Sequence, residues 1–496
     1  MVSSQTFSEW KQTGLALAVG LVAVTFVRLH TLTEPLEADE TVYAVIANDW
    51  MGGGRPYETL WDNKPIGTFI IYRLTITLLG YTETAVRLAS MVAVWIATVC
   101  LYFAVRGLGL NRILTLLMLL LWALFNSLAA CHANGANSEI FMLPFLAGAF
   151  LALQRYNVTR SIRPLSCCYL LVTLAFLIKQ VCLPFFLVPL FFIPWDQWRN
   201  AKRIVPLLIG VGALVILMHG VVYGICGYSP GFLFGQALQN TRYLANDAGN
   251  SHLAPIRTAL LFPFAAAIRP LLPITLFGGI GLLWLVISRR LRSDVMLLVS
   301  LVAAVLSVAL PGKNFPHYYI VSLPFILLAV AGVMSVWRRR TQFVVTGMLI
   351  VFLGVVSGVR YFGKSPVEIS FAKYGSAWFL QDRYIGEQLR DQGLTGKRIY
   401  VDGSHPGIYF YSNNLPATRY FVAWTYVAMK ITTFGEVFAQ LVAAQPAACV
   451  LMNPLDSPLV NDTFRSWLAT NYVFVRDIAG AKLYLPRGEE KTTDEN

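Results

Sequence analysis

Charged residues are scarce in this chain. They make up 13% of its 496 residues, whereas soluble globular proteins carry about 25%. This shortage excludes a disordered chain and a soluble nucleic-acid-binding protein. The seven cysteines include no CxxC pair and no metal-cage spacing, which excludes a disulfide scaffold and a structural zinc module. No glycine-rich phosphate loop occurs, so no nucleotide binding is assigned.

Long apolar segments take the place of charge. Hydrophobic residues reach 56% and the mean hydropathy is +0.59. One membrane crossing needs about 20 apolar residues, so we predict a polytopic α-helical membrane protein with about eleven spans. The short pair 165–178 and 181–194 forms either two crossings or a re-entrant hairpin. The candidate spans are 13–30, 82–105, 112–130, 139–154, 165–178, 181–194, 204–226, 271–288, 295–311, 318–336 and 342–361.

The net charge of +13 indicates the orientation in the membrane. The part from Phe362 onward is neutral, so the whole excess lies among the spans. Basic residues gather in alternate loops, as at Arg106, Arg112 and Arg338–Arg340. By the positive-inside rule these loops are cytoplasmic. We therefore expect the outer loop 31–81 and the C-terminal region to lie outside the cytoplasm.

The region 362–496 differs from the transmembrane region 1–361. Charges return, and helical and strand patterns alternate. An amphipathic helix is predicted over 434–444, followed by a strand at 448–451 and a hairpin over 472–485. Such alternation predicts a small extracytoplasmic α/β domain.

An acidic loop between residues 31 and 65 carries seven of the 26 acidic residues. Asp39 and Glu40 begin a predicted helix that would lie on the membrane surface with Tyr43 on its apolar face. These acids either cap that helix or take part in catalysis. Lys64, at the other end of the loop, favours catalysis, because a lysine beside carboxylates suits a lipid phosphate and can stabilise a departing one.

Two further positions carry polar groups at membrane boundaries. Glu139 starts a span, where a carboxylate usually faces a cavity or a partner, although Asn137 or Ser138 could simply cap the helix there. In a late outer loop, Lys313 and His317 offer cationic or donor groups to a phosphate. The neighbouring Tyr318 suits a sugar or lipid path, or an ordinary interfacial aromatic belt.

The order of these motifs resembles the membrane glycosyltransferases of the C-type (GT-C) fold. The similarity is to the protein O-mannosyltransferase and aminoarabinose-transferase group and covers nearly the whole chain. The matching motifs are Asp39-Glu40 with Tyr43-Ala44, Gly53 to Tyr57, Asp62 to Pro65, Arg87-Leu88, Lys179, the loop with Lys313, Pro316, His317 and Tyr318, and His405 to Tyr409.

The resemblance implies transfer of a single sugar from a polyprenyl-phosphate donor to an acceptor hydroxyl on a protein, lipid or envelope glycan. We expect Asp39 to act as the base in an inverting reaction. Lys64, Lys313 and His317 would balance the phosphate. Glu40 and Glu139 would position sugar hydroxyls, or a metal if there is one. Tyr43, Tyr57 and Tyr318 are the other expected substrate-binding residues. A divalent metal is left open, because Asn63 stands where related chains carry an acid.

Two other classes of function fit the sequence less well. A transporter or flippase of a lipid-linked substrate would carry ionisable groups near the midplane and often internal repeats, whereas here the acids cluster in an outer loop and no repeat is evident. A receptor with the C-terminal region as its binding module would not need the acidic loop. We expect a bacterial inner-membrane enzyme that contacts membrane lipids, with its active site on the periplasmic side, and no nucleic-acid partner.

Overall fold

The computed structural model describes residues 4–126, 128–193, 198–229, 231–232, 254–289, 291–361, 363–452 and 459–488. Its contacts divide the chain into two compact units. The helical unit comprises residues 1–33, 87–229 and 250–369, and the mixed unit comprises residues 34–86, 230–249 and 370–496. The mixed unit therefore unites the acidic loop with the C-terminal region. Where the bilayer ends along the chain stays a prediction.

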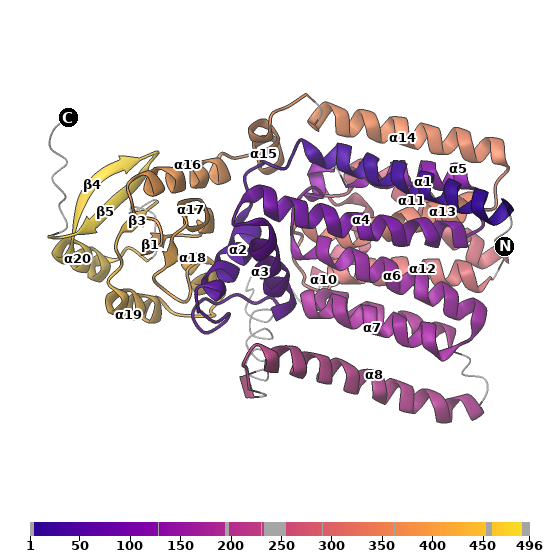
Figure 1. Ribbon diagram of the computed structural model, residues 1–496, viewed down its shortest axis with the longest axis horizontal. Coiled ribbons are helices and arrows are strands. Elements are labelled where there is room, and N and C mark those ends of the chain that lie inside the picture. Colours follow the sequence, from indigo (N-terminus) through magenta and orange to yellow (C-terminus); the bar gives the residue numbers. More distant parts are fainter. Residues whose placement is uncertain are drawn as a thin grey trace. The chain divides into compact units, whose positions relative to one another are not determined.

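The helical unit is a bundle whose long helices run side by side (Figure 1). Its α-helices are α1 (Ser4–Leu29), α4 (Glu83–Gly107), α5 (Arg112–Phe125), α6 (Ser138–Thr159), α7 (Ile162–Ile178), α8 (Trp198–Ile225), α10 (Ala254–Leu260), α11 (Leu272–Arg289), α12 (Arg292–Ala309), α13 (Leu323–Met334) and α14 (Arg339–Tyr361). Short 3-10 helices join them: η1 (Ala129–Cys131), η2 (Gln180–Phe186), η3 (Val188–Phe192), η4 (Phe262–Phe264), η5 (Arg269–Leu271) and η6 (Pro316–Ser322). Helices α4 and α15 (Pro366–Tyr374) each begin in one unit and end in the other.

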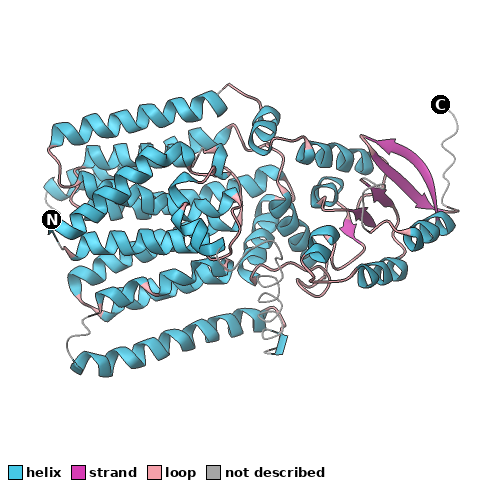
Figure 2. Ribbon diagram, turned by 180° about the vertical axis from the view of Figure 1, so that it is seen from behind, coloured by secondary structure: helices cyan, strands magenta, loops and turns pink. Residues whose placement is uncertain are grey.

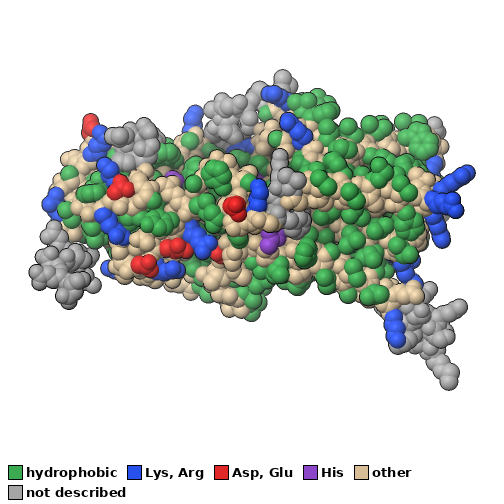
Figure 3. Space-filling view, turned by 90° about the horizontal axis from the view of Figure 1, so that it is seen from above, with side chains coloured by type: hydrophobic (Ala, Val, Ile, Leu, Met, Phe, Trp, Pro, Cys, Tyr) green, Lys and Arg blue, Asp and Glu red, His purple; other side chains and the backbone are tan. Residues whose placement is uncertain are grey.

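The surface of the bundle suits a bilayer. Within the described residues, six helices are long and apolar enough to cross a membrane. Large apolar side chains such as Phe26, Ile216 and Val351 are exposed on it. Figure 3 shows hydrophobic side chains covering the helical part, with lysine and arginine side chains at its end. Arg338 and Arg339, at the start of α14, are exposed.

The predicted span 181–194 is not an α-helix. Its described residues form the 3-10 helices η2 and η3 instead. Pro184 and Pro189 explain the difference, because proline lacks the amide hydrogen that an α-helix needs and clashes with the preceding turn. Short 3-10 segments are the usual compromise.

The acidic loop of the mixed unit contains two helices, α2 (Ala38–Met51) and α3 (Ile66–Leu79). The helix predicted behind Asp39 is present as α2, and its residues 41–47 are all buried within the protein. Its position along the membrane surface stays a prediction. Helix α3 was not predicted. Its 14 residues are apolar but too few for an ordinary crossing, so the hydropathy pattern gave no separate signal.

The C-terminal region folds around a five-stranded sheet in the order β2-β1-β3-β5-β4 (Figure 2). Strand β1 pairs in parallel with β2 and β3, and the hairpin β4–β5 completes the sheet by antiparallel pairing. The predicted hairpin and the helix over 434–444 are confirmed. The elements are α16 (Trp378–Asp391), β1 (Arg398–Asp402), α17 (Pro406–Ser412), β2 (Leu415–Pro416), α18 (Ala423–Ala428), α19 (Phe434–Ala444), β3 (Cys449–Leu451), α20 (Asp462–Asn471), β4 (Tyr472–Ile478) and β5 (Ala481–Pro486).

Ion pairs fasten the acidic loop to the C-terminal region within the mixed unit. Glu34 pairs with Lys373 at 2.9 Å, and neither side chain is exposed to solvent. Asp49 near the end of α2 pairs with Arg398 of β1 at 3.4 Å. Gly54 completes this corner, because a Cβ atom there would lie 2.0 Å from the Asp49 carboxylate. A larger residue cannot replace Gly54 without displacing that carboxylate.

Candidate functional site

The predicted site residues fall into two groups, one in each unit. The mixed unit contains Asp39, Glu40, Tyr43, Tyr57 and Lys64, and the helical unit contains Glu139, Lys313, His317 and Tyr318. Most of these residues are polar yet buried. Burial of so many polar groups requires partners, and those partners define what each group can do.

Asp39 lies in the first turn of α2 with 35% of its side chain exposed. Its Oδ2 atom accepts a hydrogen bond of 2.9 Å from the Tyr43 hydroxyl, one helical turn later. The Lys64 Nζ atom lies 3.9 Å from the same oxygen. Asp39 is therefore an oriented carboxylate that remains accessible to a substrate.

Lys64 is far less accessible than Asp39, with 10% of its side chain exposed. Its Nζ atom donates to Asn63 Oδ1 at 3.0 Å and lies 3.9 Å from Asp62 Oδ2. The same ammonium lies 5.3 Å from the centre of the Tyr43 ring. Lys64 is thus a fixed positive charge between two carboxylates, suited to stabilising an anion that forms nearby.

Glu40 caps α2. Its Oε2 atom accepts from the Glu37 backbone amide at 2.9 Å, and the Glu37 side chain accepts from Glu40 in return. This reciprocal arrangement is a capping box. Glu40 is fully buried. Its contacts agree with the predicted capping role, and a contact of Glu40 with substrate stays a prediction.

Tyr57 supports the backbone of Lys64. Its hydroxyl donates to the Lys64 carbonyl at 2.8 Å, and its ring packs 5.5 Å from that of Phe69 on α3. The Tyr57 φ angle of 67° lies in the left-handed region, which is uncommon for a non-glycine residue and often marks a functional turn. The contacts of Tyr57 fix the turn that presents Lys64.

Asp62 also belongs to this cluster, a role that the sequence did not reveal. It is 7% exposed, and burial raises the pKa of its carboxyl above the usual value, an effect that Lys64 partly opposes. A buried carboxylate is costly. The motif Asp62 to Pro65 was the sequence feature that could have indicated Asp62, but a role was predicted only for its Lys64.

We expect Asp62→Asn to stabilise the protein at neutral pH. Because the pKa of Asp62 is higher in the folded chain, its favourable contribution is complete below the ordinary pKa of 3.8 and is lost as pH rises through the folded-state pKa. The variant should therefore melt at a higher temperature than the parent at pH 7, with the difference shrinking towards pH 4 in thermal unfolding scans. A difference that does not change with pH would contradict this assignment.

In the helical unit, Glu139 and Lys179 form a buried ion pair. Lys179 lies between α7 and η2, and its Nζ atom is 4.0 Å from the centre of the Tyr318 ring. The Asn137 side chain makes no capping bond to α6. Glu139 therefore faces a charged partner, as one of the two predictions for this position stated. That partner is a lysine 40 residues away.

We expect Glu139→Gln to destabilise the protein strongly. Removing one member of a buried pair leaves the other charge uncompensated, which costs about 3–5 kcal/mol. Thermal unfolding in detergent should show a clear drop in midpoint. The double variant Glu139→Gln/Lys179→Met should recover much of that loss, and equal loss in both variants would indicate that packing rather than charge is responsible.

Lys313 and His317 are also buried in the helical unit, with exposures of 7% and 8%. The His317 ring stacks on Phe315 with centroids 5.8 Å apart and lies 4.9 Å from the Tyr318 ring. The His132 ring is 6.5 Å away. Two neighbouring imidazoles are the ligand type that zinc and similar divalent metals prefer, so this pair is the helical unit's candidate for metal ligation.

Two arginines of the helical unit have structural roles that the sequence did not indicate. Arg28 is 2% exposed and donates to the carbonyls of Ala133, Asn134 and Gly135 at 2.7, 3.0 and 3.1 Å. Arg87 donates to the Asn134 carbonyl at 3.2 Å. Both fix the segment that follows His132. Their signal was a charge at or within an apolar segment, which usually has a specific partner.

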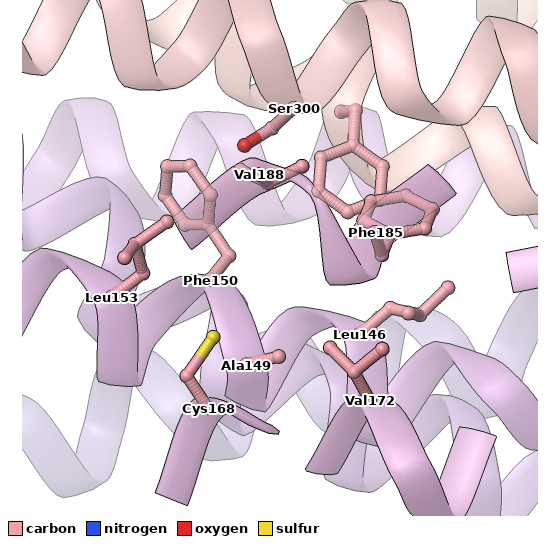
Figure 4. Close-up of a pocket in the computed structure, with 10 residues that line it drawn as sticks. Leu146, Ala149, Phe150, Leu153, Cys168, Val172, Phe185, Val188 and Ser300 are labelled. Carbon is pink, nitrogen blue, oxygen red and sulfur yellow. The ribbon is translucent and has the colours of Figure 1, made fainter. Parts of the chain in front are cut away.

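A separate pocket between α6, α7 and α12 is apolar (Figure 4). Its lining includes Phe150, Phe185 and Phe325, with the Ser300 hydroxyl as the one polar side-chain group among the described lining residues. Such a lining offers no charged group that would bind a phosphate or a sugar. The chemistry of the predicted site residues lies elsewhere.

Comparisons with known proteins agree with this architecture. Residues 63–223 match the family model of dolichyl-phosphate-mannose-protein mannosyltransferases. The chain superposes on ArnT from Cupriavidus metallidurans bound to undecaprenyl phosphate with a TM-score of 0.63 and 14% identity, over 98% of this chain and 99% of that one. The chain therefore has the fold of this ArnT, and its residues 63–223 are similar to the mannosyltransferase family.

The apo state of the same ArnT gives a TM-score of 0.61 and 13% identity, over 97% of this chain and 98% of that one. No curated protein matches the sequence. The predicted fold class is confirmed: the chain is a helical membrane protein with a mixed α/β C-terminal region. The family match includes Lys64, Glu139 and Lys179 and does not extend to Asp39 or Lys313.

Proposed function

We propose that this chain is a membrane glycosyltransferase that moves a single sugar from a polyprenyl-phosphate donor to an acceptor hydroxyl on a protein, a lipid or an envelope glycan. The observation that carries the proposal is the pairing of an accessible, oriented Asp39 carboxylate with the buried ammonium of Lys64, 3.9 Å apart. The ArnT structure contains undecaprenyl phosphate, which supports this class of donor. We place the reaction at the periplasmic side of a bacterial inner membrane, in contact with membrane lipids.

The proposed chemistry is a single displacement. Asp39 takes the proton of the acceptor hydroxyl, whose oxygen forms the new bond to the anomeric carbon. The bond from that carbon to the phosphate oxygen breaks, and its electrons leave with polyprenyl phosphate. Attack from the face opposite the leaving group inverts the anomeric configuration.

Cationic groups assist the departure of phosphate. Lys64 is positioned beside the base, and a preorganised positive charge stabilises charge that develops in the transition state. We propose the same class of role for Lys313 and His317, with Tyr318 and Glu139 as substrate-binding residues of the helical unit. A divalent metal at His132 and His317 would add positive charge when bound.

Direct assay of the reaction tests this proposal. Membranes containing the chain are supplied with a polyprenyl-phosphate donor labelled in its sugar. We expect polyprenyl phosphate to be released and the label to enter an acceptor, which mass spectrometry then identifies. A transporter or flippase would move the donor across the bilayer intact, and an uncleaved donor would contradict the proposal.

A further inference from the structure

Within the mixed unit, a segment of the C-terminal region contacts the loop that carries Lys64. The Trp61 backbone amide donates to the Arg419 carbonyl at 3.0 Å, and the Tyr426 hydroxyl donates to the Trp61 carbonyl, also at 3.0 Å. The fully buried Trp61 ring packs against Tyr426 edge to face at 5.0 Å and lies 5.9 Å from Tyr420. These contacts fix the backbone at Trp61, three residues before Lys64.

The Tyr426 hydroxyl also reaches the side chain of the next residue. It lies 3.4 Å from Asp62 Oδ1, so its single proton is shared between that oxygen and the Trp61 carbonyl. Tyr426 is 4% exposed and Asp62 is 7% exposed. A hydrogen bond to a buried carboxylate is stronger than one between neutral groups.

From Asp62 the contacts continue to the proposed base. The second oxygen of Asp62 lies 3.9 Å from Lys64 Nζ, and Lys64 Nζ lies 3.9 Å from Asp39 Oδ2. Packing of the Trp61 ring would not require a carboxylate here, and burying one is unfavourable. The presence of the Asp62 carboxylate is explained if it holds the Lys64 ammonium in place.

We propose that Tyr426 is a positioning residue for sugar transfer: it fixes Asp62, which in turn holds Lys64 beside Asp39. The C-terminal region then completes the active site and is more than an attached binding module. This inference rests on the proposed function.

A double-mutant cycle in the full-length protein tests the proposal. The variants are Tyr426→Phe, Asp62→Ala and the pair together, each assayed for transfer from the labelled donor. We expect Tyr426→Phe to lower kcat about tenfold, the effect of losing one hydrogen bond to a charged group. In the Asp62→Ala background the same change should cost less than about twofold, because the group through which Tyr426 acts is absent.

The matched control is Tyr420→Phe, which keeps the ring that contacts Trp61 and should keep normal turnover. Thermal unfolding of each variant reports on folding independently of turnover. Equal losses from Tyr426→Phe in both backgrounds, or near-normal turnover of Tyr426→Phe or of Asp62→Ala, would overturn the inference. An unmodified chain that cleaves no donor would instead overturn the proposed function.

Discussion

Replacing Asp39 by asparagine should lower the rate of sugar transfer by about 10²–10⁴-fold, the contribution of a well-placed general base. Asparagine keeps the size of the side chain and can still accept the hydrogen bond from Tyr43. It cannot take a proton from the acceptor. The loss should therefore appear in kcat, while thermal unfolding of the variant in detergent stays close to that of the parent.

The matched control is Asp391→Asn, at the exposed end of α16. It removes the same charge from the mixed unit and should transfer sugar at the normal rate. Near-normal turnover of Asp39→Asn would show that Asp39 is a structural residue of the first turn of α2 and that another group accepts the proton.

Replacing Lys64 by alanine should have the second largest effect, a loss of about 10²–10³-fold in kcat. This is the range seen when one preorganised group that stabilises developing charge is removed. The change also leaves Asp62 and Asp39 without the ammonium that lies 3.9 Å from each of them. Single-turnover measurement of polyprenyl phosphate release reports this step directly.

Lys482→Ala, on the exposed face of strand β5, is the control for loss of a lysine. Lys64→Arg should recover part of the activity, because it restores the positive charge with a different shape. If alanine at position 64 weakened donor binding and left kcat unchanged, Lys64 would contribute to ground-state binding alone.

Local patterns in the sequence were sufficient for much of the fold. The helix over 434–444 begins at Thr433, whose side chain and Glu436 form a capping box, so its start was determined by adjacent residues. The hairpin of β4 and β5 likewise depends on neighbouring residues, with Ala479 and Gly480 in its tight turn at positive φ. Long apolar runs located most of the bundle helices.

The burial of α2 and the existence of α3 could not be predicted in this way. A buried helix lacks the polar face that marks a surface helix, and a 14-residue apolar segment resembles part of a span. Both helices pack in a unit with residues beyond 370. That burial depends on partners far away in the chain.

The candidate site shows the same division. Asp39 and Lys64 were found because each stands in a recognisable short motif. Asp62 stands in the same motif as Lys64, yet its role depends on Tyr426, which is 364 residues away. The pairing of Glu139 with Lys179 similarly joins α6 to the residue that follows α7. Contacts of this kind follow from tertiary packing and leave no local pattern.

The anomeric configuration of the product tests the central claim most directly. The donor and the glycosylated acceptor are compared by NMR of the anomeric proton and carbon. If Asp39 acts as the base of a single displacement, the product has the configuration opposite to that of the donor. Retention of the donor's configuration would contradict the account, because it requires a second displacement and a covalent intermediate on the enzyme.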